Sequence, residues 1–186
     1  MKNFILVCAM AGTLVACGGA SDRYAVEPPQ VTQTQRIAFR AIEVREVSLP
    51  AYAASDEISV QTADGRLVSD GAVLWADTPN RSVSLEISRN LAQITGARVA
   101  SNPWPFEAFP DARLDLRFER LVAGEDGQFR ATGQYFVAVS DGRRERSGLF
   151  DLAVPFDPAA GPGAIAAARA QIILDLAAYL ARNGLR

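Results

Sequence analysis

The chain has 186 residues and carries 19 basic and 21 acidic side chains, which gives a formal net charge of −2. Because it contains no histidine, serine or cysteine nucleophiles activated by histidine are excluded, as are zinc sites built on cysteine and histidine. The length suits one domain with a core of its own, and the balanced charge argues against nucleic-acid binding.

The first 16 residues have the features of a secretory signal peptide. Lys2 supplies a positive charge, and the apolar run from Phe4 to Ala16 is too short to cross a bilayer, which needs about 20 helical residues. The residues Leu14-Val15-Ala16-Cys17 resemble the lipobox of bacterial lipoproteins. That resemblance implies cleavage before Cys17 and acylation of its thiol and new amino group, palmitate being one such acyl chain. The alternatives are an ordinary signal peptide and a buried N-terminal helix with an incidental cysteine.

The lipobox also suggests where the protein resides. Stable anchoring needs more than one acyl chain, and a triacylated cysteine meets that need. Gly18 rather than aspartate follows Cys17, which by analogy with enterobacterial lipoproteins favours the outer membrane over the inner membrane. We therefore expect a protein that is anchored in the cell envelope by lipid and faces the periplasm.

Removal of the signal peptide limits the chemistry of the mature chain, residues 17–186. Lys2 is the only lysine, so neither a catalytic lysine nor a P-loop lysine remains. Acylation would consume Cys17, the last thiol, so no disulfide is expected. Only carboxylates, tyrosines or a metal site with oxygen ligands could support catalysis. We expect no enzymatic activity, no cofactor and no metal site.

Residues 17–35 are predicted to be the acylated cysteine and a tether, because they are small, polar and proline-bearing. Arg23–Val26 is the one stretch of this tether that suits a short edge strand. Residues 36–186 are predicted to form the folded domain. It would begin with a strand over Arg36–Leu49, in which a bulge near Arg40-Ala41 brings the apolar side chains to one face.

A hairpin and a helix follow Pro50, which ends this strand. Ile58–Thr62 alternates as a strand, Asp64-Gly65 is typical of a type I′ turn, and a return strand begins at Arg66. The helix is predicted to have Thr78 as its N-cap and Pro79 as its first residue, and to end at Gly96. Its apolar face comprises Val83, Ile87, Leu91 and Ile94.

The C-terminal half carries the clearest pattern. After a short strand over Ala97–Ala100 and a proline-rich loop, Asp111–Val154 predicts a three-strand antiparallel meander with turns at Asp126-Gly127 and Asp141-Gly142. Ala164–Asn183 predicts a second long helix with an apolar stripe; Arg169 and Asp175 interrupt it, which favours a core helix over a membrane span. The expected fold is therefore α+β, a single mostly antiparallel sheet with two helices packed on one face, including a C-terminal meander followed by a helix.

Several short sequence motifs follow one another along the chain in an order that is typical of a known family. Leu49-Pro50-Ala51-Tyr52 follows the first strand, Leu74–Pro79 leads into the first helix, and Asn102-Pro103-Trp104 precedes the meander. Behind a lipobox, this order resembles the ABC-type transport auxiliary lipoprotein family, the family of paraquat-inducible protein C. Ala53-Ala54-Ser55 and the inserted Thr78 depart from the family's pattern, which puts in doubt any interface formed by that loop more than the fold.

The resemblance implies a non-enzymatic accessory subunit that works with an MCE-domain protein and an inner-membrane ABC transporter. Together they would move lipids between the two membranes of the envelope. The alternative hypothesis is a lipoprotein interaction module that activates a cell-wall synthase, and the neighbouring genes would discriminate between the two. The sequence leaves open whether the chain forms a homo-oligomer.

Candidate functional residues each have a structural alternative. Tyr52, Trp75 and Trp104 form the possible partner interface, but Tyr52 could brace a turn and the tryptophans could pack at the ends of the sheet. Arg143–Arg146 could contact anionic lipid headgroups or be the solvated start of a strand. Asp111 and Asp115 could form a carboxylate pair or belong to an ordinary charged surface.

Overall fold

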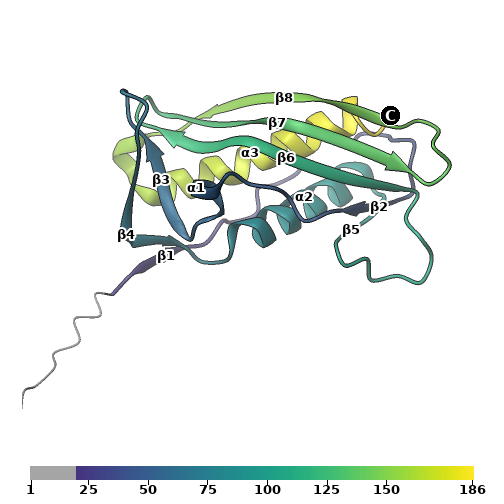
Figure 1. The fold of residues 1–186 in the computed structure, drawn as a ribbon, viewed down its shortest axis with the longest axis horizontal. Coiled ribbons are helices and arrows are strands. Elements are labelled where there is room, and N and C mark those ends of the chain that lie inside the picture. The colour runs from purple at the N-terminus through teal and green to yellow at the C-terminus, as the bar shows by residue number, and fades with distance from the viewer. Residues whose placement is uncertain (1–19) are drawn as a thin grey trace, which may run out of the picture.

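A computed structural model describes residues 20–186 (Figure 1). The predicted signal peptide and Cys17 lie outside the described residues. Along the chain the elements are β1 (Asp22–Tyr24), β2 (Ala41–Val44), α1 (Ala51–Ala54), β3 (Glu57–Gln61), β4 (Leu67–Trp75), α2 (Pro79–Thr95), β5 (Arg98–Ser101), β6 (Ala112–Gly124), β7 (Gln128–Val139), β8 (Arg146–Pro155), the 3₁₀ helix η1 (Pro158–Ala160) and α3 (Pro162–Asn183).

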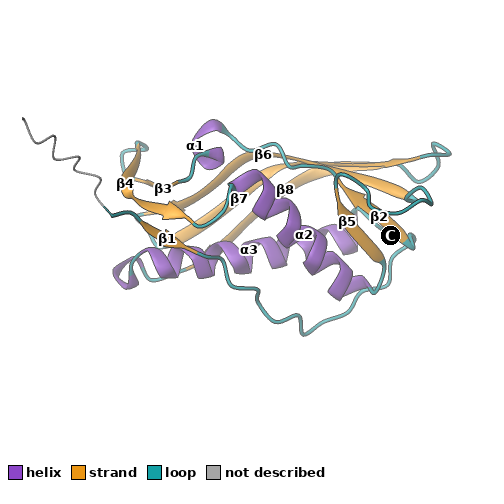
Figure 2. Cartoon of the chain, turned by 90° about the horizontal axis from the view of Figure 1, so that it is seen from below, coloured by secondary structure: helices purple, strands orange, loops and turns teal. Residues whose placement is uncertain are grey.

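The longest strand, β6, organises a sheet of eight strands. On one side it pairs with β7, and β7 pairs with β8, in the antiparallel meander that the sequence predicts. On its other side β6 pairs in parallel with β2 near its start and with β3 near its end. β5 then adds to β2, while β4 and β1 extend from β3. Helices α2 and α3 both cover one face of this sheet (Figure 2). The expected α+β fold is confirmed, with a short third helix, α1, in addition.

The three hairpin turns share one geometry. The N–H groups of Gly65, Gly127 and Gly142 each donate to the carbonyl three residues earlier, at 2.9 to 3.0 Å, and each glycine has a positive φ. The prediction of a type I′ turn at Asp64-Gly65 is wrong. That turn needs a positive φ at both central residues, and only Gly65 of the two has one. Among the described residues only Arg144 combines a side chain with a positive φ. The turn positions were predicted correctly because glycine alone adopts this conformation at little cost.

The strand predicted over Arg36–Leu49 is shorter than expected. Only Ala41–Val44 is strand, and it starts where the Asp111 carboxylate accepts the backbone N–H groups of Arg40 and Ala41, at 2.7 and 3.0 Å. Ile42 and Val44 are fully buried. The prediction of a bulge near Arg40-Ala41 is therefore wrong, because the strand begins at this point. The carboxylate of Asp111, far away in sequence, sets the backbone conformation there.

Helix α2 confirms the predicted apolar face, since Val83, Ile87, Leu91 and Ile94 are all buried. It ends as expected, with Gly96 in the left-handed region and its N–H bonded to the Ala92 carbonyl. Its start differs, because the Thr78 side chain makes no capping hydrogen bond. Asp77 instead accepts the Thr78 backbone N–H at 2.8 Å.

Helix α3 confirms the predicted second helix. It is long and apolar enough to cross a membrane, yet most of its most apolar stretch is buried inside the domain. It packs against α2 and against β7 and β8. Burial of this kind is typical of a core helix, the interpretation that the sequence favoured.

The described part of the predicted tether lies against the domain. β1 starts one residue before the stretch Arg23–Val26 that we expected to suit an edge strand and ends at Tyr24, and it pairs in parallel with β4. Tyr24, Val26 and Val31 pack on the core, and the Gln35 backbone N–H donates to the Ile94 carbonyl at 2.8 Å. Residues 22–35 are therefore ordered along the body of the protein, whereas the sequence predicts a flexible coil over this stretch.

Candidate partner interface

The structure brings two of the three predicted interface residues together. Tyr52 from α1 and Trp75 from the end of β4 line the same small cavity, of about 20 Å³. The Tyr52 hydroxyl accepts the Leu121 backbone N–H at 3.3 Å, beside an irregularity in the β6–β7 register. Trp75 is only 7% exposed. These placements favour bracing and packing, the alternatives that the sequence left open for both residues.

A charged residue lies against the buried face of Trp75. The Arg169 guanidinium carbon is 4.6 Å from the centroid of the indole, and Arg169 is only 2% exposed. Its Nη2 donates to Glu86 Oε1 of α2 at 2.9 Å and to the Ser82 hydroxyl. An aromatic face and a carboxylate together stabilise a guanidinium that burial would otherwise make costly.

The pair is only partly satisfied by hydrogen bonds. Burial raises the pKa of the Glu86 carboxyl, an effect that the charges of Arg169 and Arg89 oppose. Burial likewise lowers the pKa of Arg169, and Glu86 opposes that shift. Within the described residues, Glu86 Oε2 and Arg169 Nε have no hydrogen-bond partner. This interior pair therefore carries a large desolvation cost, and we interpret it as a structural contact between α2 and α3.

The raised pKa of Glu86 leads to a pH prediction. We expect the stability of the wild type, measured relative to Glu86→Gln, to rise as the pH is lowered from neutral toward the ordinary pKa of glutamate. In that window the folded protein binds a proton at Glu86 that the unfolded chain does not bind, so folding is favoured by acid. Denaturant unfolding of both proteins over a pH series checks this, because other titrating groups are common to both. A difference that falls on acidification would contradict it.

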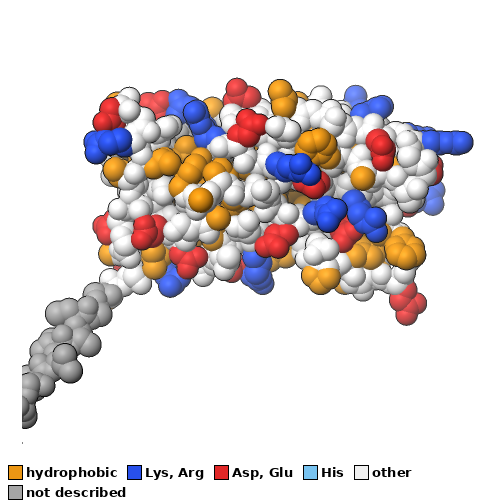
Figure 3. Space-filling model, viewed as in Figure 1, with side chains coloured by type: hydrophobic (Ala, Val, Ile, Leu, Met, Phe, Trp, Pro, Cys, Tyr) orange, Lys and Arg blue, Asp and Glu red, His pale blue; other side chains and the backbone are white. Residues whose placement is uncertain are grey.

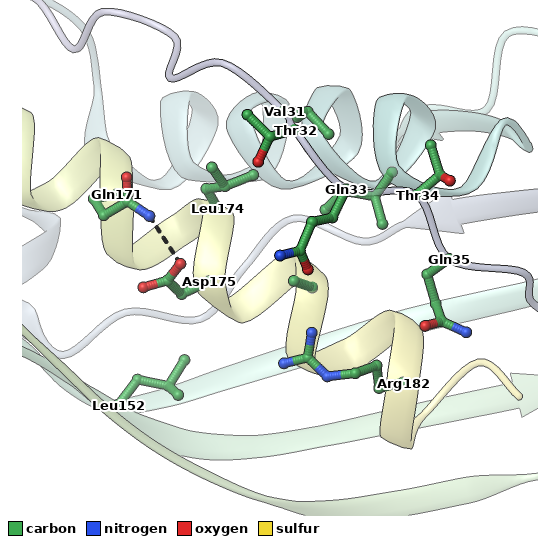
Figure 4. Close-up of a pocket in the computed structure, with 12 residues that line it drawn as sticks. Val31, Thr32, Gln33, Thr34, Gln35, Leu152, Gln171, Leu174, Asp175 and Arg182 are labelled. Atoms are coloured by element: carbon green, nitrogen blue, oxygen red, sulfur yellow. Dashed lines mark hydrogen bonds between the residues drawn. The ribbon is translucent and has the colours of Figure 1, made fainter.

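A groove lies on the outer side of α3, where the 31–35 segment crosses the helix (Figure 4). Its volume is about 390 Å³. Gln33 and Arg182 point toward each other across it, and Gln171 donates to Asp175 at 2.8 Å (Figure 4). None of the predicted interface residues lines this groove.

The third predicted residue, Trp104, lies at the opposite end of the molecule from β1, in the 102–110 loop between β5 and β6 (Figures 1 and 2). Its Nε1 donates to the Ala108 carbonyl at 2.7 Å, which closes the loop on itself. Its ring meets Phe106 edge to face at 4.9 Å, and Arg98 of β5 lies 4.9 Å from the centroid of Phe106. These contacts hold the loop in one shape.

The 102–110 loop, held in one shape by these contacts, exposes apolar side chains to solvent. Phe109 is 84% exposed and Phe106 is 42% exposed, whereas Trp104 is half-buried. Figure 3 shows the corresponding hydrophobic patch at this end, with basic side chains gathered above it. Sequence reasoning selected Trp104 and missed Phe106 and Phe109. The proline spacing of Asn102–Pro110 was the available signal, since prolines stiffen a loop and so hold its aromatic residues outward.

Arginines of the neighbouring turn lie beside this loop. Arg143 and Arg144 line a surface cavity with Phe39 and Asp111, and Asp111 directly follows the 102–110 loop. Asp111 is engaged by backbone N–H groups of the 40–41 segment, and Asp115 pairs with Arg117 at 3.2 Å. The two aspartates therefore belong to a charged surface and do not form a carboxylate pair. Among residues 20–186, no cluster of three or more potential metal ligands occurs.

Comparisons with known proteins agree with this fold. The model of a family described as the ABC-type transport auxiliary lipoprotein component matches residues 24–181. A crystal structure of an uncharacterized protein is 20% identical, with a TM-score of 0.67, and covers 87% of this chain and 98% of that chain. A crystal structure of a Xanthomonas campestris protein, of the family designated DUF330, is 21% identical with a TM-score of 0.64 and covers 87% of this chain and 95% of that chain.

A more distant likeness is to a PelC dodecamer from Paraburkholderia phytofirmans, with 13% identity, a TM-score of 0.46 and coverage of 83% of this chain and 95% of that chain. Among curated proteins no sequence matches this chain.

Proposed function

Since this chain belongs to the ABC-type transport auxiliary lipoprotein family, we propose that it is a non-catalytic accessory subunit of an MCE-type intermembrane lipid transport system. Membership of this family indicates a lipoprotein of the cell envelope that assists a transporter. In the proposed role, acylated Cys17 anchors the chain in the outer membrane, and the folded domain works in the periplasm by docking the MCE-domain protein.

The observation that best supports a docking role is the exposure of Phe109. Exposed apolar side chains are ordinary when they occur singly, but here Phe109 and Phe106 project from a loop that internal contacts hold in place. A loop that is already held in one shape in the free protein loses little conformational entropy on binding. Aromatic anchors of this kind dominate the binding energy of many protein interfaces.

The proposal is tested by general chemical crosslinking in intact envelopes, followed by purification of the acylated protein and identification of its partners. The reagent must react with carboxylates or be photoactivated, because the chain has no lysine other than Lys2. Recovery of an MCE-domain protein, and its absence when crosslinking is omitted, is the expected result. Recovery of a cell-wall synthase without any MCE-domain protein would contradict the proposed function.

A further inference from the structure

The ordered N-terminal segment sets how the domain sits relative to its membrane. Asp22, at the start of β1, is hydrogen-bonded into the sheet only five residues after Cys17. A chain advances by at most about 3.5 Å per residue, so five residues reach roughly 17 Å. The 18-residue tether that the sequence predicts would reach roughly 60 Å at full stretch.

This short connection distinguishes the two ends of the molecule. β1, the β3–β4 hairpin and the start of α3 lie at one end, and the 102–110 loop and the β7–β8 turn lie at the other (Figures 1 and 2). With Cys17 in a bilayer, the β1 end stays next to that bilayer. The aromatic loop is then carried at the end remote from the point where the chain leaves toward its anchor.

The remote end differs from the rest of the chain in charge. We define it by residues 36–40, 98–111 and 139–146, which contain six arginines and four acidic residues. The chain as a whole has more acidic than basic residues. One of the four acidic residues, Asp111, is already engaged by two backbone N–H groups. All six arginines are exposed and form no ion pair within the described residues.

We propose that this remote end is the docking face, and that its partner is a protein surface with an apolar recess for Phe109 and carboxylates opposite the arginines. Orientation argues for a protein, because the remote end is held away from the membrane that carries the anchor. Charge argues for carboxylates, because these arginines lack a carboxylate partner and belong to the same end as the aromatic loop, where Arg98 lies over Phe106 and Arg143 and Arg144 line a cavity with Asp111. This inference rests on the proposed function, which supplies the anchor at Cys17. It adds which surface of the domain docks and what chemistry the partner's surface has.

The test places a photoactivatable residue, p-benzoylphenylalanine, at single positions of the full-length protein in intact envelopes. Position 109 reports on the remote end. Position 149 is the matched control, because Leu149 is 70% exposed but lies on the edge strand β8. Position 67, at 42% exposure in the β3–β4 hairpin, reports on the end that carries β1. We expect a protein adduct from position 109 and none from positions 149 and 67.

The charge component is tested in the same system. Combining Arg143→Glu and Arg144→Glu with the probe at position 109 is expected to lower the adduct yield about fivefold, since exposed charges at an interface rim tune association modestly. The matched control, Arg182→Glu on α3, should leave the yield unchanged.

Other outcomes overturn the inference. An adduct at position 109 with lipid would show a membrane contact, an adduct with a second copy of this chain would show self-association, and no adduct would show a free surface. If general crosslinking recovers an MCE-domain protein but position 109 gives no protein adduct, the proposed function stands and the docking face is wrong. If position 109 captures a protein of another class, the docking face stands and the MCE partner is wrong.

Discussion

Replacing Arg169 by alanine is expected to destabilise the folded protein by about 3–5 kcal/mol, the usual cost of removing one partner of a buried ion pair. The variant would leave the Glu86 carboxylate buried without its hydrogen-bonded charge partner, with a pKa that burial already raises. It would also remove the guanidinium that lies 4.6 Å from the centroid of Trp75. Few domains have stability much beyond about 5–15 kcal/mol, so this single change would remove a large part of it.

The prediction is checked by denaturant unfolding, and a double variant keeps it testable if Arg169→Ala fails to fold. Arg169→Met combined with Glu86→Leu removes both charges and keeps similar volumes, so its stability should be close to that of the wild type or higher. Arg182→Ala, an exposed arginine on the same helix, is the matched control and should change stability by less than about 0.5 kcal/mol. Equal losses for Arg169→Ala and Arg182→Ala would refute the importance of the buried pair.

The second large effect is expected at Cys17. We expect Cys17→Ser to abolish acylation and to move the protein from the membrane fraction to the soluble periplasmic fraction. Each buried methylene of an acyl chain contributes about 0.8 kcal/mol to anchoring, so loss of all the chains removes essentially the whole attachment. The domain should stay folded, because within the described residues the sheet begins at Asp22, five residues after Cys17.

Fractionation with detection of the bound acyl chains measures this effect, and circular dichroism checks the fold. Cys8→Ser is the matched control, since Cys8 belongs to the predicted signal peptide and should not affect acylation of the mature chain. If Cys17→Ser still sediments with membranes after a salt wash, another attachment exists and the anchor prediction is wrong.

The sequence predicted most of the local structure. The period of apolar residues located α2, α3 and the meander, because one buried face produces the same spacing wherever it packs. Glycines located the three hairpin turns, because each turn has a position with a positive φ that glycine occupies. The errors fell where distant groups decide a local conformation, as at the start of β2, where Asp111 accepts the two backbone N–H groups.

The candidate site was predicted less well. Trp75 and Trp104 are the same residue type, yet Trp75 is buried against Arg169 and Trp104 supports an exposed loop. From the sequence, we interpreted Arg169 as an interruption of the apolar stripe of α3. Its position, four residues after Ile165 and three before Ile172, in fact completes that stripe, which was the available sign of burial. Its partner Glu86 lies 83 residues earlier, so no local pattern could identify it.

By itself the sequence predicted the order of helices and strands and the lipid anchor, because each follows from residues that are near one another in the chain. Its composition alone excluded catalysis by histidine. Only the tertiary structure decided which tryptophan is buried, which arginine is buried and how much of the N-terminal segment lies against the domain. Those properties depend on contacts between residues far apart in sequence: β1 with β4, α2 with α3, and Asp111 with the start of β2. Pairing of β1 with β4 holds the N-terminal segment at one end of the domain, and the aromatic loop lies at the opposite, remote end.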